Sequence, residues 1–299
     1  MNAPLPKTAP LQSEPSTSGL AIGSLVCGIL GFCTGITAPV GIILGILAIK
    51  AINKAPEIIG GKGLAIGGLV LSCIVTLVSV ALIGIGILPA LARAKAKANR
   101  IKCVNNLGSV GRSLHGFAAD NSERMPWQLS RLQAQNHIGS SSFVEPSAGA
   151  VYSIVALKAE LATPKVLLSP CDPARIAANE VIQSNWASFD SKSGIHLPSD
   201  SFSYGLCEGG SSLRPATVLA VTRNIHSDLN SNWTGADEYP THPNAFAGLI
   251  KSQGQLVMAD GSARQSTNAD LGLSGKITSA HTNSRGGHSI GPASTLIWR

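Results

Sequence analysis

The residues that could form a catalytic or cofactor site do not gather into a known motif in this sequence. Gly61-Lys62-Gly63 suggests a phosphate-binding loop, but no strand pattern precedes it, and the Lys-Ser or Lys-Thr ending of a Walker motif is missing. Neither a Gly-x-Ser-x-Gly elbow nor a His-Glu-x-x-His pair occurs. We therefore predict no catalytic, cofactor-binding or metal-ligating residue, no bound cofactor, and a protein that is not an enzyme.

The acidic and histidine residues suggest weaker alternatives. Asp237-Glu238 and Asn268-Ala269-Asp270 could supply oxygen ligands to Ca²⁺, a hard cation that binds carboxylates and carbonyls. The histidines, among them His226, His242 and His281, fall in polar stretches, which predicts solvated loop positions rather than ligands. No pair of carboxylates stands out for acid–base catalysis.

The six cysteines divide evenly between apolar and polar sequence. Three lie in apolar runs, where a thiol behaves as a small hydrophobic group: Cys27, Cys33 and Cys73. The other three form no Cys-x-x-Cys pair, and a Cys171–Cys207 disulfide is an alternative if this part of the chain faces an oxidising compartment. Cys103 would then remain a single thiol, which argues against a disulfide scaffold.

Two long runs without charged residues predict a transmembrane anchor over residues 19–88. Asp, Glu, Lys and Arg are absent from Gly19–Ile49 and again from Gly63–Ala92. About 20 apolar residues span a bilayer as a helix, so the lipid bilayer is an expected partner. Met1–Ser18 is rich in Pro, Ser and Thr and predicts a disordered tail. This tail lacks the basic leader of a secretory signal, so we expect the anchor to be retained.

The first apolar run leaves two interpretations open. Gly35, Thr37 and Pro39 interrupt its middle, so it forms either one long, tilted and kinked helix or a hairpin of two helices, Gly19–Phe32 and Pro39–Ile52. We favour the hairpin, and the anchor then has two or three helical segments.

The charges around the apolar runs predict membrane topology. The loop Lys50–Lys62 carries three lysines against Glu57, and the positive-inside rule places it in the cytoplasm. The second run, Gly63–Leu88, would then cross outward. Much of the net charge of +7 lies in Ile58–Ala119, which lacks acidic residues. Its position predicts contact with anionic lipid headgroups and no nucleic-acid partner.

Glycines spaced by four residues are frequent in the anchor. Such pairs let helix backbones approach closely in lipid, and they are Gly19/Gly23, Gly31/Gly35, Gly41/Gly45 and Gly63/Gly67. They predict packing within the anchor, and self-association through the same glycine-rich helices is an alternative.

The chain after the anchor predicts a long helix followed by a small sheet. Apolar residues recur at three- and four-residue steps through residues 89–121, which predicts an amphipathic helix continuing the last membrane helix and ending at Asn121–Pro126. The apolar positions are Leu91, Ala94, Ala98, Ile101, Val104, Leu107, Leu114 and Phe117. The candidate strands are Lys165–Leu168, Ser201–Leu206, Thr217–Thr222, Gln255–Ala259, Ser262–Ser266 and Ser294–Trp298, with a hairpin turn at Asp260-Gly261.

These elements predict an α+β membrane protein. Its order would be N-terminal transmembrane helices, a long helical spine and a small antiparallel β-sheet domain at residues 122–271. Residues 272–299 are rich in Gly and Ser and predict a polar C-terminal tail.

Residues 18–88 resemble a glycine-rich bacterial membrane domain of unknown function, the 4190 family. The similar pieces are Ser-Leu-Val-Cys-Gly-Ile-Leu-Gly at 24–31, Pro-Val-Gly-Ile-Ile-Leu-Gly at 39–45 and Gly-Leu-Ala-Ile-Gly-Gly-Leu-Val at 63–70. This resemblance implies a membrane location and no particular activity.

From Leu88 onward the chain is similar to the prepilin-like proteins of Planctomycetes and Verrucomicrobia, which are built like type II secretion pseudopilins. The similar pieces are Leu-Pro-Ala-Leu-Ala-Arg-Ala-Lys at 88–95, Cys-Val-Asn-Asn-Leu at 103–107, Phe-Ala-Ala-Asp-Asn at 117–121, Ser-Pro-Cys-Asp-Pro at 169–173 and Val-Met-Ala-Asp-Gly at 257–261. The resemblance implies a pilin-like fold, in which a long helix is half embedded in the membrane and half packed on a small antiparallel sheet.

Three departures from that family's pattern matter. No acidic residue lies in the helix before Leu88, an extra apolar segment precedes that helix, and Ile250 stands where the family has a histidine. We therefore expect permanent anchoring rather than assembly into a fibre. Positive-inside would keep the basic segment Arg93–Lys102 in the cytoplasm. The family carries similar basic helices and still exports its domain, so we expect the domain outside the bacterial cytoplasmic (inner) membrane.

The expected function is that of a membrane-anchored, pseudopilin-like structural or interaction protein of the bacterial cell envelope, with a link to secretion. Its expected partners are other envelope or secretion proteins. The alternative is a membrane-tethered sensor or ligand-binding module with an extracytoplasmic domain, which requires a pocket lined by convergent polar groups.

Overall fold

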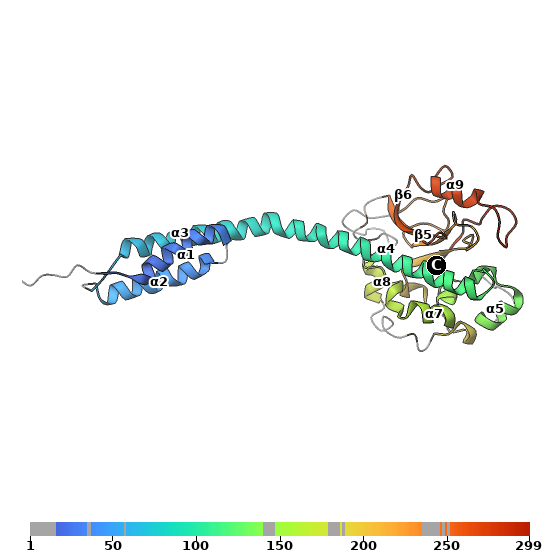
Figure 1. The fold of residues 1–299 in the computed structure, drawn as a ribbon, viewed down its shortest axis with the longest axis horizontal. Coiled ribbons are helices and arrows are strands. Elements are labelled where there is room, and N and C mark those ends of the chain that lie inside the picture. The colour runs from blue at the N-terminus through green and yellow to red at the C-terminus, as the bar shows by residue number, and fades with distance from the viewer. Residues whose placement is uncertain are drawn as a thin grey trace, which may run out of the picture. The chain divides into compact units, whose positions relative to one another are not determined.

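The structure is a computed structural model that describes residues 16–34, 37–56, 58–139, 147–178, 186, 189–234, 246, 249 and 252–299. The chain divides into two compact units, Met1–Arg93 and Ala94–Arg299. We call them the N-terminal unit and the C-terminal unit (Figure 1).

The N-terminal unit is a bundle of three helices. These are α1 (Gly19–Thr34), α2 (Thr37–Lys54) and α3 (Lys62–Leu82), and each packs against the other two. The first apolar run therefore forms two helices, as in the hairpin interpretation. A short parallel pair, β1 (Ser16–Thr17) and β2 (Ile59–Gly60), lies beside them.

Small residues allow the three helices to approach closely. Ser24 Oγ donates a hydrogen bond to the carbonyl of Gly41 at 3.0 Å. A Cβ atom added at Gly68 would lie 2.7 Å from the backbone nitrogen of Leu25, and one added at Gly31 would lie 2.7 Å from Ala38 Cβ. No side chain fits between these backbones, so glycine is required at both positions.

Helix continues from α3 into the C-terminal unit. A π-helical segment, Ile83–Ile87, follows α3, and α4 (Leu88–Asp120) follows it without a break. Pro89 lacks a backbone N–H, and its ring crowds the carbonyl of Ile85 four residues earlier. The wider π-helical turn lies at this point, where the regular hydrogen-bond pattern is interrupted.

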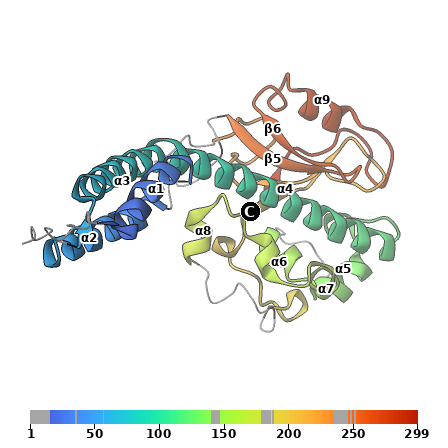
Figure 2. The same cartoon turned by 60° about the vertical axis from the view of Figure 1, so that its left-hand side comes forward.

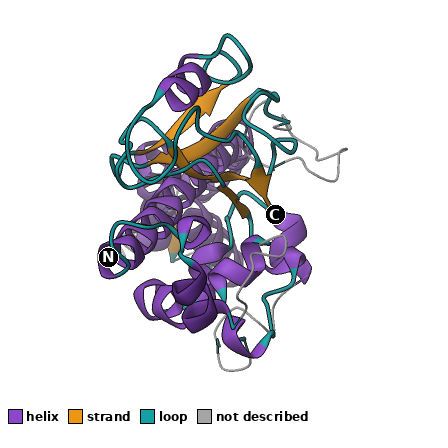
Figure 3. Ribbon diagram, turned by 90° about the vertical axis from the view of Figure 1, so that its right-hand side faces the viewer, coloured by secondary structure: helices purple, strands orange, loops and turns teal. Residues whose placement is uncertain are grey.

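The C-terminal unit contains a five-stranded sheet in the order β6-β5-β4-β3-β7, with antiparallel pairing (Figure 3). The strands are β3 (Tyr204–Cys207), β4 (Val218–Thr222), β5 (Gln253–Met258), β6 (Ala263–Thr267) and β7 (Ile297–Trp298). The α-helices α5 (Arg131–Ile138), α6 (Ala148–Tyr152), α7 (Val155–Leu161), α8 (Pro173–Ala178) and α9 (Lys276–Asn283) complete the unit. An α+β fold with a long helix and an antiparallel sheet is therefore confirmed.

The sheet separates two hydrophobic cores. On β5, Val257 faces the core formed by α4, whereas Leu256 and Met258 face the core formed by α9. Figures 1 and 2 show α4 and α9 on opposite sides of the sheet. On β4, the pairing register shifts between Val218 and Ala220. A β-bulge of this kind interrupts the strict alternation of faces.

The buried stripe of α4 starts later than the sequence predicts. Leu107, Leu114 and Phe117 are buried as expected, but Leu91 and Ile101 are exposed. The remaining large buried positions of this face, Cys103 and Val110, were missing from the predicted stripe. Contact with the C-terminal unit's core therefore starts at Cys103, and α4 ends at Asp120, where the prediction places its end.

Two of the predicted strands need correction. In place of the strand Lys165–Leu168 the chain forms a 3₁₀ helix, Pro164–Leu167, because a proline at the first position favours helical entry. Ser201–Leu206 is a strand only from Tyr204 onward, since Ser199–Ser201 is a 3₁₀ turn and β3 begins at Tyr204. The hairpin is confirmed: β5 and β6 flank Asp260-Gly261, and Gly261 has a φ of +86°.

Residues 272–299, predicted as a polar tail with a strand at Ser294–Trp298, also contain a helix that the sequence did not predict, and β7 lies within the predicted strand. This segment contains α9 and β7, and β7 pairs with β3 at the edge of the sheet. Buried Arg214 also holds it, because its guanidinium donates to the carbonyls of Gly286, Ser289 and Gly291. The compact unit therefore extends beyond the predicted domain of residues 122–271.

Candidate functional site

The structure does not gather the candidate residues of the sequence into one site. His226 is exposed, while His242 and Asp237-Glu238 lie outside the described residues. The Asp270 carboxylate accepts hydrogen bonds from Thr267 N at 2.9 Å and Ser266 Oγ at 3.1 Å, so it stabilises the turn after β6. Among the described residues, no three His, Cys, Asp or Glu side chains come together as they would around a metal ion.

The prediction that His281 is a solvated loop residue is wrong. His281 lies on α9 and is fully buried. Its Nδ1 accepts a hydrogen bond from Val218 N at 3.0 Å, so the ring proton is on Nε2. Nε2 donates to the carbonyl of Ser294 at 2.7 Å. Burial lowers the pKa of His281, which favours this neutral form.

Cys207 lies beside His281 but does not form a nucleophile–base pair with it. The Sγ–Nε2 distance is 3.9 Å, yet Nε2 already carries a proton and has no lone pair to accept the thiol proton. Burial raises the pKa of Cys207 to about 12, so the thiolate required of a nucleophile is disfavoured. The arrangement connects α9 to β3 and β4.

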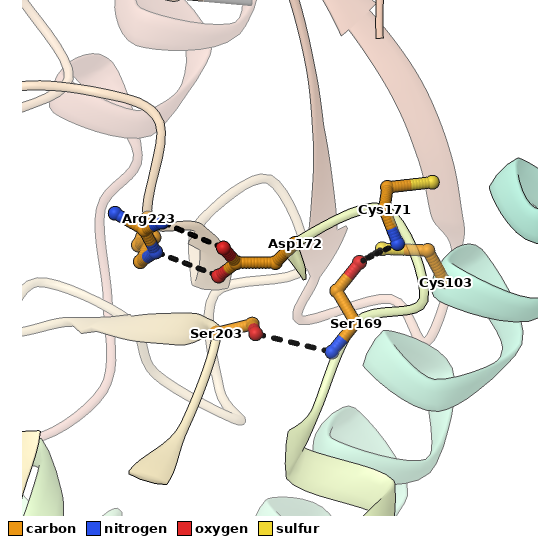
Figure 4. Close-up of polar contacts among 6 residues, drawn as sticks. All are labelled: Cys103, Ser169, Cys171, Asp172, Ser203 and Arg223. Atoms are coloured by element: carbon orange, nitrogen blue, oxygen red, sulfur yellow. Dashed lines mark hydrogen bonds and ion pairs between the residues drawn. The ribbon is translucent and has the colours of Figure 1, made fainter. Parts of the chain in front are cut away.

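A second cluster joins α4 to the turn after the 3₁₀ helix (Figure 4). Ser169 Oγ donates to Cys103 Sγ at 2.9 Å and accepts from Cys171 N at 3.1 Å. Tyr204 Oη approaches Cys103 Sγ to 3.4 Å from the sheet side. Burial raises the pKa of Cys103 to about 12 and that of Cys171 to about 11. Both thiols are therefore protonated in the folded state.

The Cys171–Cys207 disulfide, which the sequence left open as an alternative, is not present in the structure. Both cysteines are free thiols, and they contact different partners, Ser169 for Cys171 and His281 for Cys207. The spacing of the cysteines in the sequence did not indicate that Ser169 and His281 would be their neighbours.

Next to Cys171, an ion pair is buried in the core. Both nitrogens of the Arg223 guanidinium fork, Nε and Nη2, donate to the two carboxylate oxygens of Asp172 at 2.6 Å. The guanidinium also lies over the Phe246 ring, 5.4 Å from its centroid. Bidentate geometry satisfies both charges in a place that excludes water. The pair is a structural connection between the turn after residue 169 and the end of β4.

One cavity has the character of a ligand pocket. It has a volume of about 300 Å³ and is lined by Lys102, Asn106, Thr163, Lys165, Val166, Leu168 and Pro170. The lining therefore combines two ammonium groups, two neutral polar groups and three apolar side chains. Asn106 Nδ2 donates to the carbonyl of Leu168 at 3.1 Å, which ties α4 to the opposite wall.

The surface of the N-terminal unit is the other candidate functional feature. Two helices of the described residues are long and apolar enough to cross a membrane, Thr37–Lys54 and Lys62–Asp120, and Gly19–Phe32 is a shorter apolar helix. Within α1, α2 and α3 the buried positions are mostly Ala, Gly and Ser, whereas most Ile, Leu, Val and Phe side chains face outward.

Residues 20–82 match the family model of a domain of unknown function, DUF4190. The match confirms the predicted unknown-function domain and covers α1, α2 and α3 up to Leu82. No curated protein and no solved structure matches the chain. The DUF4190 match lies within the N-terminal unit and does not extend to the sheet, so the pseudopilin resemblance stays a prediction.

Sequence reasoning missed the residues that make the contacts of the C-terminal unit. Cys103 was treated as the unpaired thiol, and Asp172 and Arg223 were not linked. Asp172 stands in the Ser-Pro-Cys-Asp-Pro segment, which could have marked it as a special turn. Arg223 follows a strand like any basic residue, and nothing in its neighbourhood in the sequence indicates a buried partner.

Proposed function

We propose that this protein is a non-enzymatic, membrane-anchored structural or interaction protein of the bacterial cell envelope. The observation that carries the proposal is the distribution of side chains in the DUF4190 unit. Small residues lie between its helices, and its outward face is formed by large apolar side chains. Exposing such a large apolar surface to water is unfavourable. In lipid, by contrast, helices associate through small residues and keep large apolar side chains on the outside.

Helix α4 supports the structural role. Its N-terminal part, up to Lys102, is basic and largely exposed, and from Cys103 onward it packs on the sheet. A helix that leaves an apolar unit and then forms the spine of an α+β unit is the arrangement expected of a pseudopilin-like protein. In this proposal the C-terminal unit is extracytoplasmic and binds other envelope or secretion proteins.

The membrane part of the proposal can be tested with two matched substitutions. Leu77 on α3 is 72% exposed and Leu132 on α5 is 74% exposed, so their environments differ in the proposed solvent rather than in exposure. An aspartate near the centre of a membrane helix costs about 2.5–3.5 kcal/mol on insertion scales, but it is harmless in water. We expect Leu77→Asp to reduce the fraction of full-length protein that resists alkaline carbonate extraction, and Leu132→Asp to leave it unchanged. Equal behaviour of the two variants would contradict membrane insertion.

The sidedness of the C-terminal unit needs a separate experiment. A reporter that is active only outside the cytoplasm and one that is active only inside it are fused in turn after Arg299. Activity of the first reporter supports the proposed exported unit. Activity of the second alone would overturn the extracytoplasmic location while leaving the membrane anchor intact.

A ligand-binding module is the second candidate, because the cavity between α4 and residues 163–170 favours it. Its two lysines suit a carboxylate, and its three apolar side chains suit a short hydrocarbon chain. Octanoate, titrated calorimetrically into the full-length protein in micelles, should bind to wild type and to Lys276→Glu but not to Lys165→Glu. Lys276 lies on α9, away from the cavity-lining residues. Equal heats in all three proteins would reject this candidate.

A further inference from the structure

The two buried thiols near Ser169 come from segments far apart in the sequence. Cys103 belongs to α4, and Cys171 belongs to the turn that precedes α8. Both are almost completely buried, and both are free in the structure. A single hydroxyl group, Ser169 Oγ, contacts the sulfur of the first and the backbone nitrogen of the second.

These contacts limit the separation of the two cysteines. Because the hydrogen bonds to Ser169 Oγ measure 2.9 Å and 3.1 Å, Cys103 Sγ and Cys171 N are no more than about 6 Å apart. A disulfide additionally needs Cα atoms ~4.4–6.8 Å apart, and the oxidation experiment below tests whether the two segments reach that geometry. Figure 4 shows the two cysteines together beside Ser169.

We propose that Cys103 and Cys171 form a redox-active pair that closes to a disulfide and covalently joins α4 to the Ser169–Asp172 turn. The oxidant is a disulfide donor, either a protein disulfide or oxidised glutathione. One cysteine thiolate attacks a sulfur of the donor and releases one donor thiol. The second thiolate then attacks the mixed disulfide and releases the other. Two electrons and two protons leave the cysteine pair, and two donor thiols form.

The same burial that brings the pair together controls when it can react. Thiol–disulfide exchange requires a thiolate, and burial holds the pKa of both thiols above its ordinary value. The Arg100 guanidinium lowers the pKa of Cys171, but less than burial raises it. The two thiols therefore react slowly in the folded protein. Their oxidation state is set while the chain folds or when this region opens locally.

The bond would stabilise a contact that the fold already uses. Asp172, directly after Cys171, forms the buried ion pair with Arg223. A disulfide at residue 171 would hold this turn on α4 and keep the carboxylate near its partner. It would also close a long loop, for which the chain-entropy model predicts a large restriction of the unfolded chain.

The pairing can be tested on the full-length protein in detergent micelles. The protein is equilibrated in a reduced and oxidised glutathione buffer at the guanidinium concentration that half unfolds the C-terminal unit, so every thiol of that unit becomes accessible. It is then denatured, alkylated with N-ethylmaleimide and digested without reduction. We expect a linked peptide joining Cys103 and Cys171, with Cys207 alkylated. The melting temperature of the oxidised protein should exceed that of the reduced protein by about 10 °C.

Three single variants provide the controls. Cys207→Ser should retain the linked peptide and the shift in melting temperature. Cys103→Ser and Cys171→Ser should each lose both, and the remaining cysteine should be alkylated. A linked peptide that contains Cys207 in wild type, or alkylation of both Cys103 and Cys171 after equilibration, would overturn the proposal. Because the buffer replaces the cellular compartment, neither outcome depends on the proposed membrane location or export.

Discussion

The two units of this chain bury opposite kinds of side chain. Between α1, α2 and α3 the buried residues are mainly alanine, glycine and serine, and between α4 and the sheet they are mainly leucine, valine, phenylalanine and tyrosine. The N-terminal unit has its large apolar side chains outside, and the C-terminal unit has them inside. The same polypeptide therefore follows two packing rules, each suited to a different solvent.

This difference predicts opposite responses to changes in side-chain size. Where backbones touch, as at Gly68, there is no room for an added methyl group. Where large side chains fill a core, as at Phe117, the loss of atoms leaves a cavity. All four tryptophans lie in the C-terminal unit, so their fluorescence reports its unfolding.

The largest effect should come from Phe117→Ala in the C-terminal unit. Phe117 is fully buried and packs on His137, with ring centroids 5.1 Å apart. Truncation of such a side chain lowers the free energy of unfolding by about 3–5 kcal/mol. Guanidinium unfolding of the full-length protein, followed by tryptophan fluorescence, measures this change. Leu132→Ala, at an exposed position, is the control and should stay within about 0.5 kcal/mol. Equal losses would show that burial does not decide the cost in this unit.

The next effect concerns the buried ion pair, which has no counterpart among the described residues of the N-terminal unit. Asp172→Ala removes the carboxylate that the buried Arg223 guanidinium binds, and we expect a loss of about 3 kcal/mol in the free energy of unfolding. The double variant Asp172→Ala/Arg223→Met removes both charges and should be more stable than Asp172→Ala alone. The tryptophan assay applies here as well. If the double variant lost as much unfolding free energy as Asp172→Ala and Arg223→Met lose together, the two groups would act independently.

The third prediction moves the comparison to the N-terminal unit. Gly68→Ala places a Cβ atom 2.5 Å from Ser24 Oγ and 2.7 Å from the backbone nitrogen of Leu25, so the helices must separate. We expect a destabilisation of about 1–3 kcal/mol, as for overpacked cores. Loss of helical circular dichroism during titration with sodium dodecyl sulfate measures it.

Gly67 is the matched control for Gly68. It is the adjacent residue of α3, and a Cβ atom there would have no neighbour within 4 Å. Gly67→Ala should therefore leave the transition unchanged or raise it slightly, because alanine favours helix. If both variants lowered the transition equally, glycine would be needed on the outward face too, and helix contacts between copies of the chain would be the explanation.

The N-terminal unit was the more predictable of the two. Long uncharged runs gave the helices, and glycine spacing gave the principle of their packing. The spacing did not give the correct face in every case: Gly41 and Gly45 do contact neighbouring helices, but Gly63 and Gly67 point to open space and Gly68 packs instead. A four-residue repeat defines a stripe on a helix, and only the position of the partner helix decides which stripe is buried.

In the C-terminal unit, local signals succeeded and distant ones failed. The Asp260-Gly261 turn could be predicted because its hairpin forms within a few residues. The helix within residues 272–299 was missed because Gly and Ser content describes the segment alone. The buried contacts of His281 and Arg214 involve residues on other elements. Asp172 and Arg223 are also far apart in the sequence, so local composition did not indicate that they pair.

The smallest effect is a pH dependence that should appear in the C-terminal unit and depend on His281. Burial lowers the pKa of His281 in the folded state, whereas an unfolded histidine titrates near its ordinary value of about 6.5. Between these two pKa values the unfolded chain binds the proton more strongly. The stabilisation is therefore complete above about pH 6.5 and is lost as the pH falls from there through the folded pKa. The slope cannot exceed about 1.4 kcal/mol per pH unit for one proton.

The variant His281→Gln separates this contribution from that of other groups. Its amide does not titrate, so the free energy of unfolding should be lower than that of wild type at pH 8 and should fall less between pH 6.5 and pH 5. His137 also has a lowered pKa and contributes with the same sign, but it is present in both proteins and cancels in the difference. Identical pH profiles for wild type and variant would mean that protonation of the buried ring is not linked to unfolding. The hydrogen bond from Val218 N makes a linkage necessary, because protonated Nδ1 cannot accept it.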